Sequence, residues 1–264
     1  MKERRETCWT AKELTEAMKR GELKLVYQPQ VHLHTGRIVG VEALLRWSHP
    51  QEGAVSPESV VQAALRNGIG GELDDYVLHR ALADAKRTQL LQRVHLCVNA
   101  SAYAVDTDRW LKRVDRALDQ WNVERGQIVM ELTEQVAPMA VCELQKLVRS
   151  LRDLGVQVAL DDFGMGMNQL QSLRALPLEW VKMDGEWTRT AGDDPVSRQV
   201  LASLTTLGDR FQFQVLAEGV ETDEQLHILK ELGCRYGQGF GLGRPVRAGE
   251  LTQLFELTRK GAFV

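Results

Sequence analysis

Short apolar segments alternate with amphipathic segments along almost the whole chain, and six of the apolar segments run directly into a polar side chain. The segments are 38–41, 94–98, 128–130, 156–160, 180–181 and 215–217, and the residues that follow are Glu42, Asn99, Glu131, Asp161, Lys182 and Glu218. One apolar strand that ends on a charged or amide residue is ordinary. Six in series indicate that several strand ends meet at one polar site, as they do at the C-terminal rim of a parallel barrel.

The segments between these strands carry helix-start signals. Thr10–Glu13 and Thr222–Gln225 match capping boxes, and Ser56-Pro57 and Asp194-Pro195 place an N-cap before a proline at the first helical position. The apolar spacing then predicts helices over 11–21, 57–68, 73–91, 107–121, 140–154, 168–175, 195–209, 222–233 and 249–259.

Eight strands are predicted, over 25–28, 38–46, 94–99, 128–132, 156–161, 180–183, 214–218 and 236–238. The turn at His34–Arg37 joins the first two as an antiparallel hairpin. The later strands alternate with helices, which favours a mostly parallel sheet, and their polar ends favour a closed barrel over an open sheet. The chain contains no linker or internal repeat, so residues 1–264 are expected to form a single domain.

Composition and charge narrow the classes of function. With 264 residues, 44% of them hydrophobic, the chain can fill one large core. A formal net charge of −3 provides no basic field for a DNA or RNA polymer, so none is expected as a partner. The four cysteines show no CxxC spacing, which argues against a zinc cluster and favours a reducing compartment. No apolar stretch approaches the roughly 20 residues that span a bilayer, so we expect no membrane contact and a location in the cytoplasm, alone or as part of a longer protein.

The polar strand ends offer mostly oxygen donors. Carboxylate and amide oxygens suit Mg²⁺, Mn²⁺ or Ca²⁺ better than a softer metal. No pair of histidines has a ligand spacing that accompanies these carboxylates. A site for a hard divalent cation is therefore expected at the rim.

Eight short motifs follow one another along the chain. They are Tyr27-Gln28-Pro29, Glu42-Ala43-Leu44-Leu45-Arg46-Trp47, Val98-Asn99-Ala100-Ser101, Glu131-Leu132-Thr133-Glu134, Asp161-Asp162-Phe163-Gly164, Lys182-Met183-Asp184, Glu218-Gly219-Val220-Glu221-Thr222 and Gln238-Gly239-Phe240. Together they resemble the EAL-domain family of cyclic-di-GMP phosphodiesterases over residues 11 to 258. Any one of these motifs is weak evidence, whereas eight in this order are specific.

The resemblance implies a TIM-like (β/α)8 barrel with one antiparallel strand. It also implies hydrolysis of one phosphodiester bond of cyclic di-GMP to linear 5′-pGpG, which lowers the level of this second messenger. Mg²⁺ or Mn²⁺, with two ions at the site, is the expected cofactor, and Ca²⁺ is expected to inhibit. A homodimer is a further expectation, and any sensor or GGDEF domain of the full-length protein would lie outside this chain.

The resemblance also assigns roles to individual residues. The first metal ion would be held by Glu42, Asn99, Glu131 and Asp161, and Asp162 would bridge to a second ion. The catalytic residues would be Glu218, Lys182, Asp162 and Gln238. Substrate contacts fall to Gln28 and Arg46, and supporting roles to Glu134 and Glu221. Because neighbouring residues of a strand point to opposite faces, Asp161 and Asp162 are expected to sit at the very tip of their strand.

The sequence departs from the family pattern in two places. After Asp162-Phe163-Gly164, two methionines, Met165 and Met167, replace a threonine and a tyrosine. Loss of their hydroxyl hydrogen bonds is expected to give a slower or more weakly regulated enzyme. Ala64-Leu65 stands where family members often carry Ala-Glu, and only local helix repacking is expected there.

Two other functions stay open at this stage. An EAL-type domain that has lost turnover would serve as a cyclic-di-GMP receptor or as a protein-interaction regulator. A different barrel enzyme, such as a Mg²⁺-dependent lyase, would use Lys182 as a base or Schiff-base nucleophile.

Overall fold

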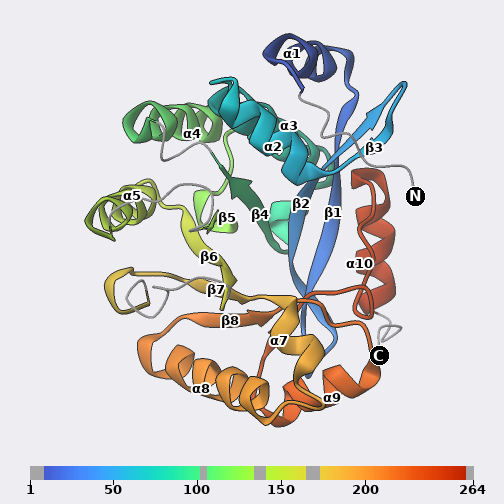
Figure 1. Cartoon of the computed structure of the whole chain (residues 1–264), viewed down its shortest axis with the longest axis vertical. Coiled ribbons are helices and arrows are strands. Elements are labelled where there is room, and N and C mark those ends of the chain that lie inside the picture. The colour runs from blue at the N-terminus through green and yellow to red at the C-terminus, as the bar shows by residue number, and fades with distance from the viewer. Residues whose placement is uncertain (1–8, 102–105, 134–140, 165–172, 260–264) are drawn as a thin grey trace.

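The computed structural model describes residues 9–101, 106–133, 141–164 and 173–259, and within these ranges the strands form a closed ring (Figure 1). The ring consists of β1 (Leu23–His32), β2 (Arg37–His49), β4 (His95–Ala100), β5 (Ile128–Thr133), β6 (Gln157–Phe163), β7 (Trp180–Met183), β8 (Gln214–Ala217) and β9 (Tyr236–Gly237). The order around the ring is β1-β9-β8-β7-β6-β5-β4-β2, and pairing of β2 with β1 closes it. Only β1 runs antiparallel to its two ring neighbours. The predicted barrel with one antiparallel strand is confirmed.

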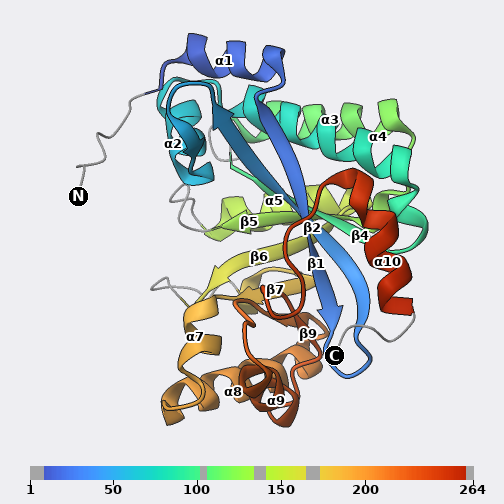
Figure 2. The same ribbon diagram turned by 90° about the vertical axis from the view of Figure 1, so that its right-hand side faces the viewer.

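Helices cover the outside of the ring (Figures 1 and 2). They are α1 (Ala11–Arg20), α2 (Pro57–Arg66), α3 (Gly70–Thr88), α4 (Thr107–Trp121), α5 (Val141–Asp153), α7 (Gly185–Thr190), α8 (Pro195–Phe211), α9 (Asp223–Glu231) and α10 (Leu251–Arg259). In the described part of the chain, short 3₁₀ turns lie at Leu90–Gln92, Arg125–Gln127 and Ala248–Glu250. Both predicted capping boxes form, at Thr10 and Thr222, and Ser56 and Asp194 cap the helices that begin with a proline.

Among the described residues, one strand and one α-helix were not predicted from the sequence pattern. Strand β3 (Gly53–Val55) pairs with the end of β2 outside the ring, because β2 continues to His49 and the chain then turns back on it. Helix α7 is six residues long and is capped by Asp184. A helix of that length shows too little of the 3.6-residue period to be detected. The helix predicted over 168–175 lies mostly outside the described residues.

The inside of the barrel explains why polar side chains gather at one level. A small apolar cluster, separate from the core beneath the helices, is formed by Cys97, Val129, Ala159, Trp180 and Leu216, with Tyr236 packed against it. Residues two positions later on a strand point to the same face. On these six strands those residues are Asn99, Glu131, Asp161, Lys182, Glu218 and Gln238. One layer of the barrel interior is therefore apolar, and the next layer toward the C-terminal rim is polar.

Below the apolar layer, His95 packs inside the barrel. Its ring lies 4.9 Å from that of Trp180, and its Nε2 is 3.1 Å from Oε1 of Gln30 on the antiparallel strand. A Cβ at Gly40 would lie 2.2 Å from His95 Nε2, so the glycine makes room for the imidazole. Burial lowers the pKa of His95 to about 4 from its usual 6.5.

Stability is expected to fall in mild acid because of His95. Below pH 6.5 the unfolded chain takes up a proton on this residue that the folded chain excludes until about pH 4. The stabilisation is complete above pH 6.5 and is lost as the pH falls from there toward 4. Between pH 7.5 and pH 5 the contribution of His95 to the free energy of unfolding should fall by about 2 kcal/mol. Denaturant unfolding of wild type, His95→Gln and the exposed-site control His34→Gln at both pH values would test this. An equal pH dependence in His95→Gln and wild type would contradict it.

Candidate functional site

Lys182 lies at the centre of the polar layer and is surrounded by carboxylates. Its Nζ is 3.4 Å from Glu42, 3.1 Å from Glu131, 3.0 Å from Asp161 and 3.0 Å from Glu218. The lysine side chain is only 2% exposed, and that of Glu131 is fully buried. These five residues come from five different strands or strand ends, so only closure of the barrel brings them together.

The charges in this cluster shift one another's proton affinities. Burial acts to lower the pKa of Lys182, but the surrounding carboxylates, Asp161 first, raise it well above its usual value. Burial raises the pKa of Glu131 well above normal, and the nearby Glu42 adds to the increase. Burial also raises the pKa of Glu218 to about 8 despite the neighbouring ammonium group. Four carboxylates face one ammonium group in this cluster, so Glu131 and Glu218 hold their protons to a higher pH than usual.

Glu42 differs from its neighbours because three donors face it. Burial alone would raise its pKa, but Lys182 and hydrogen bonds from Gln238 and Asn99 bring it below the usual value. Gln238 Nε2 donates to Glu42 Oε2 at 2.6 Å, and Asn99 Nδ2 donates to Glu42 Oε1 at 2.8 Å. Gln28, opposite Glu42 on β1, accepts from Gln238 at 3.4 Å and donates to the carbonyl of Gly243. This amide network keeps Glu42 ionised and fixes its orientation.

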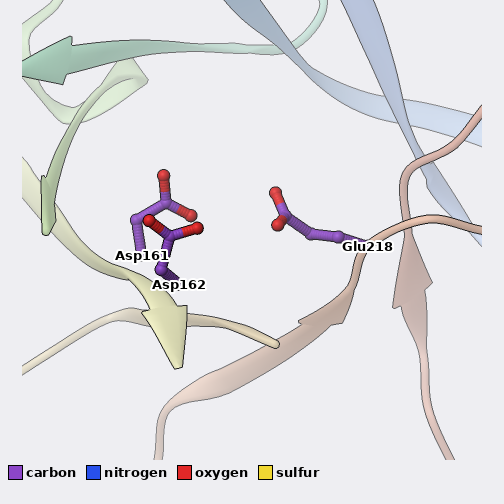
Figure 3. A group of neighbouring side chains, drawn as sticks. All are labelled: Asp161, Asp162 and Glu218. Atoms are coloured by element: carbon purple, nitrogen blue, oxygen red, sulfur yellow. The ribbon is translucent and has the colours of Figure 1, made fainter. Parts of the chain in front are cut away.

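A β-bulge brings the adjacent residues Asp161 and Asp162 to the same side. The register of β6 against β7 shifts between Leu160 and Phe163, so β6 contains one extra residue there. Asp162 occupies this position with φ 55°, a left-handed conformation that aspartate tolerates better than most residues. Figure 3 shows both aspartates facing Glu218. The expectation that the pair lies at the tip of the strand is wrong, because β6 continues to Phe163 and the bulge redirects Asp162 instead.

Asp161, Asp162 and Glu218 form a group that could hold a metal ion. Each offers a carboxylate oxygen, and these oxygens all lie within 4.8 Å of one another (Figure 3). Burial raises the pKa of Asp162, and the charge of Asp161 raises it further. Thr133 Oγ1 lies 3.5 Å from Asp162 Oδ2, at the limit of a hydrogen bond.

A cavity of about 640 Å³ is lined by Glu42, Asn99 and Asp162 and by residues of α2 and α3. Arg46 also lines it, with Nη1 donating to the carbonyl of Leu45 at 2.7 Å. The volume suits a ligand of nucleotide size.

Asp74 and Ser101 line the cavity; Ser101 belongs to one of the eight motifs but received no role from the sequence, and Asp74 was not singled out at all. Asp74 on α3 accepts from the backbone N and the hydroxyl of Ser101 and from Nε1 of Trp110. It therefore ties the end of β4, just beyond Asn99, to α3 and α4. Asp74 is separated from Ser101 by 27 positions, so no local pattern signals this contact.

Of the two predicted supporting residues, Glu221 and Glu134, the structure describes only Glu221. Glu221 is exposed just before α9, and its backbone N–H donates to Gln225. Within the described residues no hydrogen bond or ion pair joins its side chain to the site. Glu134, Met165 and Met167 lie outside the described residues.

The donor set fits a hard divalent cation. The carboxylates of the cluster supply only oxygen ligands, which Mg²⁺ and Mn²⁺ prefer. In the part of the chain that the structure describes, Oε1 of the buried Glu131 has no hydrogen-bond partner, so one acceptor remains for a ligand. A buried acceptor is rarely left unpaired.

Comparison with known proteins places this arrangement among EAL domains. The sequence model of the family described as EAL domain matches residues 11–245. A cyclic di-GMP phosphodiesterase of Pseudomonas aeruginosa is 34% identical over 86% of this chain, and the cyclic di-GMP phosphodiesterase NbdA of the same organism is 32% identical over 94%. The structure of the PaMucR phosphodiesterase in complex with c-di-GMP superimposes with a TM-score of 0.84 at 32% identity, covering 91% of this chain and 98% of that one.

These curated relatives are much longer than the present chain. The matched region is 39% of the first phosphodiesterase and 32% of NbdA. Within the described ranges, no helix is both long enough and apolar enough to cross a membrane.

Proposed function

The chain belongs to the EAL-domain family, and on that premise we propose that it hydrolyses one phosphodiester bond of cyclic di-GMP to give linear 5′-pGpG. The observation that carries the proposal is the ring of carboxylates around Lys182, one of which, Glu42, also lines a nucleotide-sized cavity. Two relatives described as cyclic di-GMP phosphodiesterases and a neighbouring structure in complex with c-di-GMP support this choice of substrate.

The charge of the cluster supports a pair of divalent cations. With Glu42, Glu131, Asp161, Asp162 and Glu218 all ionised, five carboxylates against one ammonium group would leave a formal charge of −4. Two Mg²⁺ or Mn²⁺ ions would neutralise it. Glu42, Asn99, Glu131 and Asp161 would hold one ion, and Asp162 would be a ligand of the second. Bound ions of this kind lower the pKa of water and stabilise charge on the phosphate.

The protein side chains then have distinct roles. Glu218, whose carboxylate lies 3.0 Å from Lys182 and in the group with Asp161 and Asp162, would take the proton of the attacking water. Attack at phosphorus breaks the bond to the 3′ oxygen and leaves the phosphate on the 5′ carbon, as the product 5′-pGpG requires. Lys182 provides a fixed positive charge beside the developing negative charge. Gln238 and Gln28 hold Glu42 in place, and Arg46 lies where a guanidinium can contact a phosphate.

Separation of nucleotides after incubation with cyclic di-GMP tests the proposal. With Mg²⁺ or Mn²⁺ we expect conversion to 5′-pGpG, and with a chelator or with Ca²⁺ in their place we expect the substrate to stay intact. Calorimetric binding of cyclic di-GMP without any turnover would overturn hydrolysis in favour of a receptor. In that case the first variant to test for recovered turnover would restore the family residues, threonine at Met165 and tyrosine at Met167.

A further inference from the structure

We infer that Lys182 is a built-in counter-ion that holds the carboxylate ring together without metal and competes with divalent cations for it. The inference rests on the metal-binding part of the proposed function and is independent of which nucleotide is hydrolysed. It concerns the affinity of the site for metal and the stability of the metal-free chain.

The first observation is that Lys182 has more partners than it can satisfy. Four carboxylates lie within 3.4 Å of Nζ, whereas an ammonium group has three protons to donate. The contacts come from strands on different sides of the barrel. One point charge at the centre therefore contacts β2, β5, β6 and the end of β8 simultaneously.

The second observation is that the ring would repel itself without this charge. Lys182 is 2% exposed, and the side chains of Glu42 and Glu131 are 6% and 0% exposed, so little water reaches them. Removing one partner of a buried charged pair is strongly destabilising, because the remaining charge is left uncompensated. In this ring four carboxylates share the one cation.

The third observation is that Lys182 uses the same groups that a metal ion would use. Nζ contacts oxygens of Glu42, Glu131, Asp161 and Glu218, and Asp161 and Glu218 also belong to the group that could hold a metal. Among the described residues, Oε2 of Glu131 contacts the ammonium group and Oε1 has no hydrogen-bond partner, so this carboxylate keeps one oxygen available for a second cation. Metal binding must weaken the hold of Lys182 on the other carboxylates. By linkage, removal of the ammonium charge must favour the metal.

The test compares Lys182→Met, which keeps much of the length and loses the charge, with Lys146→Met, an exposed lysine on α5. Thermal unfolding is measured in chelator and in saturating Mn²⁺, and Mn²⁺ binding is measured by calorimetry without nucleotide. In chelator, Lys182→Met should melt about 10 °C below wild type. In saturating Mn²⁺ the deficit should shrink by at least half, and Mn²⁺ should bind at least about 10-fold more tightly. Lys146→Met should match wild type in every measurement.

A merely structural role for Lys182 predicts a different outcome. The melting temperature would then fall equally with and without Mn²⁺, or the affinity for Mn²⁺ would be unchanged or weaker, and either result overturns the inference. If Lys182→Met does not fold in either buffer, the double variant Lys182→Met/Glu131→Gln tests the counter-ion role instead. Removing one negative charge together with the positive one should restore folding in chelator, and failure to do so overturns the counter-ion role. Loss of cyclic di-GMP hydrolysis alone would leave these results unaffected and would count only against the proposed activity.

Discussion

Glu42→Gln is expected to lower kcat/KM for cyclic di-GMP hydrolysis by on the order of 10³-fold or more, with the fold retained. Loss of an outer hydrogen bond to a metal ligand already costs 10- to 100-fold in comparable sites, and Glu42 is proposed as a ligand itself. Glutamine keeps the shape of the side chain, but it removes the charge that faces Lys182 at 3.4 Å and replaces one acceptor oxygen with a donor. That donor would meet Nε2 of Gln238 or Nδ2 of Asn99, which are also donors.

Steady-state kinetics with Mn²⁺ would measure the loss, and circular dichroism would confirm that the variant is folded. Glu143→Gln, a change of the same chemistry at an exposed position on α5, serves as the matched control and should leave turnover unchanged. Full turnover by Glu42→Gln would show that Glu42 does not hold a metal needed for the reaction.

Gly239→Ala is expected to destabilise the protein by about 3 kcal/mol and to lower turnover as well. A Cβ at this position would lie 2.1 Å from the carbonyl oxygen of Val220 and 2.3 Å from its backbone nitrogen. Backbone atoms cannot rotate away as a side chain can. The two segments are also joined by hydrogen bonds, from Val220 N to the carbonyl of Gln238 and from Gly241 N to the carbonyl of Val220.

The loss of turnover follows from what these two segments carry. Glu218 lies two residues before Val220, and Gln238 immediately precedes Gly239, so separating the segments moves both side chains of the site. Gly249→Ala is the control, because a Cβ there meets nothing within 4 Å. Urea unfolding would measure the loss of stability, and steady-state kinetics would measure the loss of turnover. Wild-type stability of Gly239→Ala would show that the loops after β8 and β9 can separate at little cost.

Much of the fold was accessible from local pattern alone. Helix starts at Thr10, Ser56, Asp194 and Thr222 depend on a side chain and a backbone N–H two or three residues away, so they can be recognised without tertiary information. Most ring strands were predicted because each is a buried apolar segment between helices, and the first two because a turn joins them as a hairpin. Strand β3 and helix α7 were missed because three and six residues are too few to display a period.

For the site too, part of the arrangement could be predicted from the sequence and part could not. That Glu42, Glu131, Asp161, Lys182 and Glu218 follow apolar strands is visible in the sequence, and closure of the barrel brings them into contact, as expected. A further signal in the sequence was overlooked. Each interior residue of the apolar layer is followed two positions later by a polar one, which is the alternation of a strand with one face toward the barrel interior.

The sequence by itself determined the order of strands and helices, the helix caps and the identity of the polar residues at the strand ends, because these depend on neighbours within a few positions. Only the tertiary structure decided that β6 continues through a bulge with Asp162 in a left-handed conformation. Only the tertiary structure decided that Lys182 meets four carboxylates, and that Asp74 holds Ser101. These contacts join residues from distant parts of the chain, and their geometry is fixed by the register and closure of the whole ring, which no local pattern contains.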